Sequence, residues 1–160
     1  MEGLEALFRK LDSIAEIKPD LMKVMDKAGE FIRDDARQLV PVDKGDLRKS
    51  IQHTTKDTGI SVESVVHTNS DHAAFVEFGT GPVGAANHEG ISPHVNPQYR
   101  TEKWLGVVPF LKSEDDTGLR YIAGQRAQPY LYPALKDNEE QLREYLKEEI
   151  AKAIRRKING

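Results

Sequence analysis

The chain has 160 residues, a formal net charge of −3 and 31% charged residues. This length suits a single domain over residues 1–160, and a mixed surface of low net charge does not favour sequence-specific nucleic acid binding. The chain contains no cysteine, which excludes disulfides, thiolate metal sites and cysteine nucleophiles. No stretch approaches the roughly 20 apolar residues of a membrane span, so we expect a cytosolic protein unless a larger particle carries it.

Apolar residues recur at helical spacing over residues 4–15 and again over residues 21–39. Pro19 lies between the two stripes, in a position that suits the first turn of a helix. Pro41 follows the second stripe and should end it. The pattern therefore predicts two amphipathic helices separated at Pro19.

The pattern changes to short β-rich runs over residues 50–55 and 60–67. Residues 56–59 between them supply turn chemistry, so the two runs predict a β-hairpin. Ile60, Val62 and Ser64 should share one partly apolar face, because side chains alternate along a strand. That face needs a helix to cover it.

Glycines and prolines interrupt every period between residues 81 and 116, which predicts a long loop or arm. A possible strand follows over residues 118–123, and we define the arm insertion as residues 81–121. The last segment predicts a closing helix whose apolar face would consist of Leu131, Leu135, Leu142, Leu146, Ile150 and Ile154.

Together these elements predict an α+β fold. The N-terminal helices and the long C-terminal helix would pack on one face of a small antiparallel sheet, and the Gly/Pro-rich arm would extend from it.

Histidines and one glutamate raise an enzymatic alternative. His72 and Glu77 are five residues apart, and an imidazole beside a buried carboxylate can act as an acid/base pair. His88 and His94 could contribute to a metal site, although their spacing defines no third ligand. A metal-dependent hydrolase or nuclease using these groups is thus one alternative, and a small host regulatory or toxin module is another.

Residues 39–51 form a compact connection between the predicted second helix and the first strand. Asp43 is placed to cap a short helical turn over residues 46–49. Gly45 should serve the backbone conformation of this connection, and the side chain of Leu47 should serve its packing. The chemistry of this segment indicates a structural function.

Three segments resemble motifs of the HK97 gp10-like family of siphophage tail-completion proteins. Residues 41–51 resemble P-V-D-T-G-x-L-R-x-S-I, with Lys44 replacing threonine, and residues 72–80 resemble Y-A-x-x-V-E-F-G-T, with His72 replacing an aromatic residue. Residues 129–135 resemble P-F-L-x-P-A-L, with Tyr132 where arginine is common. The matching positions are Pro41, Asp43, Gly45, Leu47, Arg48, Ser50, Ala73, Glu77, Phe78, Gly79, Thr80, Pro129, Leu131, Pro133, Ala134 and Leu135.

The resemblance implies a structural phage or prophage protein without catalytic residues, cofactor or metal. Such a subunit would be made in the bacterial cytoplasm and reside in the neck or tail of the virion. There it would form a homo-oligomeric ring, with a hexamer as our expectation. Its partners would be the head connector or portal-adaptor proteins and the tail tube or tail terminator protein. The arm is longer than this family's pattern leads us to expect.

Glu77 has a structural role in this interpretation. We expect its carboxylate to accept backbone hydrogen bonds or to pair with a basic residue such as Arg48. It would thereby hold the second motif against the first.

Overall fold

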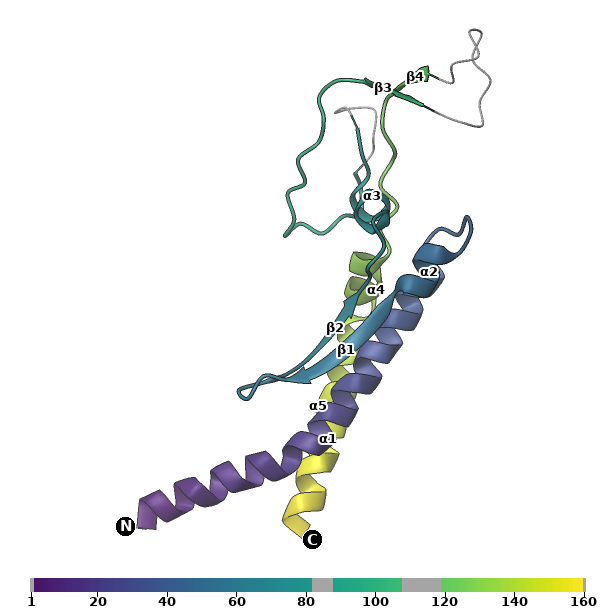
Figure 1. The fold of residues 1–160 in the computed structure, drawn as a ribbon. Coiled ribbons are helices and arrows are strands. Elements are labelled where there is room, and N and C mark those ends of the chain that lie inside the picture. Colours follow the sequence, from purple (N-terminus) through teal and green to yellow (C-terminus); the bar gives the residue numbers. More distant parts are fainter. Residues whose placement is uncertain (1, 82–87, 108–118, 160) are drawn as a thin grey trace.

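The computed structural model describes residues 2–81, 88–107 and 119–159. The expected α+β class is confirmed, because long N- and C-terminal helices accompany a small antiparallel sheet (Figure 1). In chain order the elements are α1 (Glu2–Leu39), α2 (Asp46–Ser50), β1 (Gln52–Asp57), β2 (Val62–His67), α3 (Ala73–Phe78), β3 (Trp104–Val107), β4 (Leu119–Ile122), α4 (Leu131–Asp137) and α5 (Glu139–Asn159).

The N-terminal segment is one helix, so the predicted separation at Pro19 is wrong. Helix α1 is 38 residues long and contains Pro19. Figure 1 shows its N-terminal part diverging from the remainder, and a proline inside a helix produces such a bend because it removes one backbone hydrogen bond. Beyond Pro19, burial of Ala28, Ile32 and Ala36 holds the helix against the rest of the domain.

The predicted hairpin is present as the antiparallel pair of β1 and β2, with Thr55 opposite Ser64. Both strands pack against α1, and β2 turns Val62 and Ser64 toward this side while Val65 is exposed. Gly29 of α1 is buried, and a Cβ there would collide with Ser64 Oγ. The glycine therefore allows the strand to approach the helix closely.

Residues from α1, the start of the hairpin and α4 form the core: Ile32, Ala36, Val40, Ile51, Tyr130 and Ala134. The buried contacts of α4 and α5 include the alanines Ala134 and Ala153, each 0% exposed. By contrast, Leu135 and Ile154 of the predicted apolar face are 51% and 39% exposed. Small side chains let helices approach closely, so the larger ones remain at the margins.

The arm contains an antiparallel ribbon of β3 and β4, in which Trp104 pairs with Ile122 and Leu105 with Tyr121. The expected strand at 118–123 corresponds to β4, but β3 falls where only loop was predicted, so that part of the prediction is wrong. Residues 82–87 and 108–118 of the predicted arm lie outside the described residues. Figure 1 shows the ribbon far from both termini.

None of the helices in the described ranges is long and apolar enough to cross a membrane.

Candidate functional site

Glu77 lies at the centre of the contacts between the second and third motifs. It is 4% exposed, the one buried charged residue in the described chain. Its Oε2 accepts the backbone N–H groups of Tyr130 at 2.8 Å and Leu131 at 2.9 Å. Its Oε1 accepts the N–H of Tyr132 at 3.0 Å. Both carboxylate oxygens are thus engaged by the backbone.

The three donors are the N–H groups at the beginning of α4. The first turn of a helix has no internal acceptors for its N–H groups, and its dipole favours negative charge there. Pro133, the next residue, has no N–H. Glu77 therefore satisfies each backbone donor of this turn up to Pro133, which explains how a carboxylate can be buried here without a cationic partner.

The structure shows the backbone hydrogen bonds expected of Glu77 and not the alternative pairing with Arg48. Arg48 is exposed on α2, and Glu77 joins the second motif to the third instead of the first. His72, the proposed acid/base partner, is exposed immediately before α3. Since the oxygens of Glu77 are occupied by backbone donors, the arrangement favours a structural role for the carboxylate.

The two ends of the arm are joined by backbone hydrogen bonds. The N–H of Thr80 donates to the carbonyl of Gln125 at 2.8 Å, and the N–H of Gln125 returns a bond to Thr80 O at 2.9 Å. Closer to the domain, Gln128 N donates to Val76 O at 2.8 Å. The departing and returning chains therefore run side by side at the base of the arm.

Three glycines make this close approach possible. Gly79, Gly81 and Gly124 all have positive φ angles, of 75°, 104° and 106°. A Cβ on Gly79 would lie 2.7 Å from Ala127 N, and one on Gly124 would collide with Thr80 O. The base of the arm therefore requires glycine both for its backbone angles and for space.

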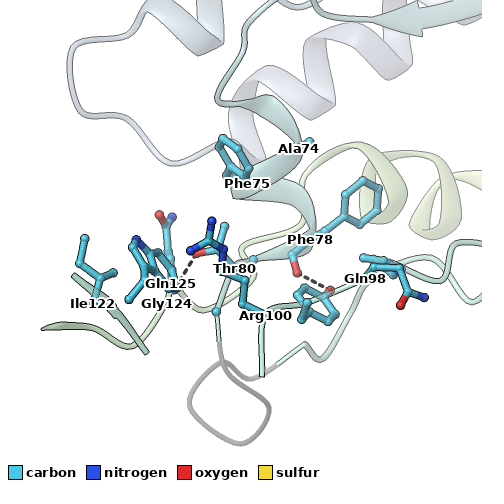
Figure 2. A pocket seen from close by; sticks show the side chains of 14 residues that line it. Ala74, Phe75, Phe78, Thr80, Gln98, Arg100, Ile122, Gly124 and Gln125 are labelled. Carbon is cyan, nitrogen blue, oxygen red and sulfur yellow. Dashed lines mark hydrogen bonds between the residues drawn. The ribbon is translucent and has the colours of Figure 1, made fainter. Parts of the chain in front are cut away.

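Beside this junction lies a groove of about 800 Å³. Phe75 and Phe78 come from α3 and Ile122 from the ribbon (Figure 2). Trp104 of the ribbon also lines the groove. The Tyr99 hydroxyl donates to Phe78 O at 2.7 Å and so ties the arm to α3. The wall also contains Arg100, whose guanidinium lies 5.3 Å from the Trp104 ring centroid.

The first motif connects α1 to β1 as expected, but without the predicted cap. Helix α2 begins after Gly45, at φ 82°, with no side-chain cap, so the role assigned to Asp43 is wrong. Leu47 packs against the core. The Ser50 hydroxyl donates to Leu47 O at 2.8 Å and lies 2.6 Å from Thr68 Oγ1. Pro41, Asp43 and Arg48 are exposed.

The remaining motif positions lie near the Glu77 contacts or at their margin. Gly79 is buried, and Ala73, Phe78, Thr80, Pro129, Leu131 and Pro133 are half-buried. Ala134 is buried in the core, whereas Leu135 is exposed. The structure thus joins the second and third motifs directly through Glu77. The first motif contributes Leu47 and Ile51 to the core that contains Tyr130 and Ala134.

Sequence reasoning missed Arg37. Its Nε and Nη2 donate to the carbonyl of Ile51 at 3.1 and 2.7 Å, which fixes the start of β1 on α1. No local pattern pairs a helix arginine with this carbonyl. Gly29 did carry a signal, because a glycine inside an apolar helical stripe indicates close packing.

The loop histidines do not assemble a metal site in the described ranges, where no group of three or more His, Cys, Asp or Glu residues could hold an ion. His88 instead stacks on Tyr99, with ring centroids 4.0 Å apart and planes 10° apart.

The fold and the Glu77 contacts define a structural α+β domain, in which a buried carboxylate and a glycine junction hold distant segments together. Residues 5–79 match the family described as "Bacteriophage HK97-gp10, putative tail-component". The match supports the expected family, and these residues are similar to the HK97-gp10-like family. The match supports a phage structural role and a place in the virion. Comparisons with curated proteins and with solved structures found no match.

Proposed function

We propose that this protein is a ring-forming subunit of the phage or prophage neck, which completes the tail or joins it to the head connector. The observation that carries the proposal is the match of residues 5–79 to a tail-component family. Within those residues lie the first motif and all of the second except Thr80, including Glu77. The third motif supplies the backbone donors for Glu77, so it belongs to the same structural unit.

The architecture suits a subunit that holds a contact element in a defined position. The helices and hairpin form the body, and the arm leaves it between two chains joined at Thr80 and Gln125. The proposal therefore treats residues 1–160 as one domain with an arm insertion at 81–121. A fixed body with a projecting element can repeat the same contact around an axis and close a ring.

The proposed partners are further copies of the chain, in a ring of six, together with connector or portal-adaptor proteins on one side. The tail tube or tail terminator protein would meet the other side. The motif residues would act by holding the subunit's shape, and the family's description favours a role without catalysis.

Deleting the gene from the phage or prophage that encodes it tests the proposal. Particles made without the protein should show heads and tails that are not joined, and expression of the chain in trans should restore joined particles. Finding complete infectious particles without the protein would contradict it. A portal, capsid or tail-tube gene beside this one would give independent support.

The enzymatic alternative has its own test. A metal-dependent hydrolase should show a thermal shift with divalent cations and turnover of nucleic acid or peptide. A regulatory module should remain a monomer or dimer at every concentration. Either result would count against the neck subunit.

A further inference from the structure

Helix α1 changes direction near Pro19. Figure 1 shows the residues before it diverging from the body of the domain, while the remainder of the helix runs along α5. Proline has no N–H to donate to the carbonyl four residues earlier, and its ring crowds that carbonyl, so the helix is weakened at this turn. Residues 2–18, which we call the N-terminal segment, are therefore joined to the body through a weakened turn.

The buried core of the domain begins only after this turn. Val24, at 7% exposed, is the first buried residue of α1 among the side chains that the structure describes. Pro19 itself is exposed, and Leu21 and Met22 are half-buried. Packing therefore holds α1 firmly from Val24 onward, and the direction of the N-terminal segment depends on other contacts.

Lys18, the last residue before Pro19, is bonded to the tip of the β1–β2 hairpin. Its Nζ donates to both carboxylate oxygens of Asp57, at 3.2 and 3.1 Å, and to the carbonyl of Gly59 at 3.0 Å. All three acceptors lie at the end of β1 or in the turn that follows it. A single ammonium group thus connects the N-terminal segment to the hairpin.

The hairpin turn offers Lys18 a well-fixed partner. The N–H of Gly59 donates to Asp57 Oδ1 at 2.7 Å, and the N–H of Thr58 donates to Ser61 O at 2.9 Å. The Gly59 N–H, followed by the Lys18 ammonium, lowers the pKa of Asp57 below its usual value of 3.8. The carboxylate is therefore charged at neutral pH, and the turn holds it in place.

A second ion pair joins the N-terminal segment to the end of α5. Lys157 Nζ lies 3.8 Å from Glu16 Oε2. The four side chains of the two pairs are all partly exposed, from 29% for Lys18 to 65% for Glu16. Ion pairs of this kind contribute little free energy and are screened by salt. Such contacts can open while the body of the domain stays folded.

We infer that Pro19 is a hinge and that Lys18 is its latch. While the hairpin tip holds Lys18, the N-terminal segment keeps one direction, and when that contact opens the segment rotates as a helix. The rotation requires changes only around Pro19, since a hinge needs few residues. It redirects the segment that carries the apolar stripe of residues 4–15. The inference concerns the single chain and goes beyond the proposed neck function.

The distance between two spin labels tests the latch. The chain has no cysteine, so Lys10→Cys on the N-terminal segment and Lys147→Cys on α5 introduce the only labelling sites. The Lys147 side chain is 75% exposed. Pulsed electron paramagnetic resonance should give one narrow distance distribution for the labelled chain. A broad distribution in this chain would contradict a closed latch.

Lys18→Met should broaden that distribution. Methionine removes the ammonium group but has a helix propensity close to that of lysine. Lys23→Met is the matched control, because the Lys23 side chain is 78% exposed and its ion pair, with Asp20, lies within α1. The control should leave the distribution unchanged. A Lys18→Met distribution like that of the control would overturn the inference.

Asp57→Asn assigns the effect to the pair. Asparagine keeps an oxygen that can accept the Gly59 N–H, but it loses the charge that Lys18 meets. The substitution should also broaden the distribution, and the double variant should match Lys18→Met, because both changes act on one contact. Salt at about 1 M, where the Debye length is about 3 Å, should broaden the distribution of the otherwise unaltered chain.

Pro19→Ala tests the hinge. Alanine restores the missing N–H, so the helix should straighten, the mean distance should shift, and the distribution should stay narrow even together with Lys18→Met. An unchanged mean distance in Pro19→Ala would overturn the hinge. Circular dichroism should show the same helix content in every variant, and a loss of helix in Lys18→Met would show that Lys18 maintains the fold instead of the direction. None of these outcomes depends on whether particles lacking the protein have joined heads and tails.

Discussion

Glu77 accepts the backbone N–H of Leu131 at 2.9 Å, across 54 positions of sequence. The bond joins the helix that precedes the arm to the helix that follows it. The arm is therefore bracketed by one buried carboxylate and, a few residues outward, by the Thr80–Gln125 backbone pair. This relationship suggests how an insertion can be enlarged while the body of the domain is maintained.

Replacing Glu77 with glutamine should lower the free energy of unfolding by about 3 kcal/mol. The amide NH₂ group would take the place of one oxygen, so at least one N–H at the start of α4 would lose its acceptor. Hydrogen bonds to the charged oxygens would also become neutral ones. Chemical denaturation followed by circular dichroism measures the change.

Glu140→Gln is the control for that substitution, since Glu140 is exposed in the first turn of α5. Its effect should remain within about 0.5 kcal/mol. If Glu77→Gln unfolded at the same denaturant concentration as the control, the carboxylate would not be holding α4.

Tyr130→Phe should stabilise the protein at neutral pH by about 1 kcal/mol. Tyr130 is 0% exposed, and among the described residues its hydroxyl has no hydrogen-bond partner. Removing an unpaired buried hydroxyl removes its desolvation cost. Denaturation of both proteins at neutral pH gives the difference, and a clear loss of stability would show that the hydroxyl is paired in solution.

The difference in stability between the unaltered protein and Tyr130→Phe should increase at alkaline pH. Burial, followed by the negative charge of Glu77, raises the pKa of Tyr130 from its usual value of 10.0 to about 12. Stability from the neutral phenol is fully present below pH 10 and is lost as pH rises toward 12, because the unfolded chain ionises first. The loss is at most about 3 kcal/mol and absent from Tyr130→Phe. Equal pH profiles for the two proteins would contradict the raised pKa.

Gly124→Ala should destabilise the base of the arm more than Gly59→Ala destabilises the hairpin turn. Both glycines have positive φ, of 106° and 89°, so both alanines are strained by about 1 kcal/mol. Only the Cβ at Gly124 also meets backbone, at Thr80 O, whereas nothing lies within 4 Å at Gly59. Overpacking should add about 1–3 kcal/mol. Faster hydrogen exchange at the Gln125 N–H would locate the effect, and equal costs at the two positions would refute the close junction.

Replacing residues 82–123 with a short glycine-serine linker should leave a cooperatively folding domain. Gly81 and Gly124 already lie together, since a Cβ on Gly81 would collide with the Gly124 Cα. The loss of the Tyr99 hydrogen bond to Phe78 should cost about 1 kcal/mol. Thermal unfolding and sedimentation would measure folding and association. Loss of the cooperative transition would mean that the arm is part of the core.

Several features were predictable because their signals are local. The hairpin followed from alternating residues around a turn, and its two strands differ from the predicted ranges by a few residues at most. The helical stripe after Pro19 likewise identified Ala28, Ile32 and Ala36, all buried. Strand β3 was missed because Trp104–Val107 is short and contains glycine. Its partner β4 lies farther along the chain, after a sequence segment without helical or strand periodicity.

By itself, the sequence determined the α+β class, the hairpin, the helical stripes at both ends of the chain and the family motifs, since each depends on short-range periodicity or on matched residues. It also singled out Glu77 and offered backbone N–H groups or Arg48 as its partners, but it joined Glu77 to the first motif instead of the third. Only the tertiary structure placed the start of α4 against that carboxylate and Gln125 against Thr80. Contacts between distant segments depend on how the helices and the hairpin pack together, and the spacing of residues along the chain does not predict that packing.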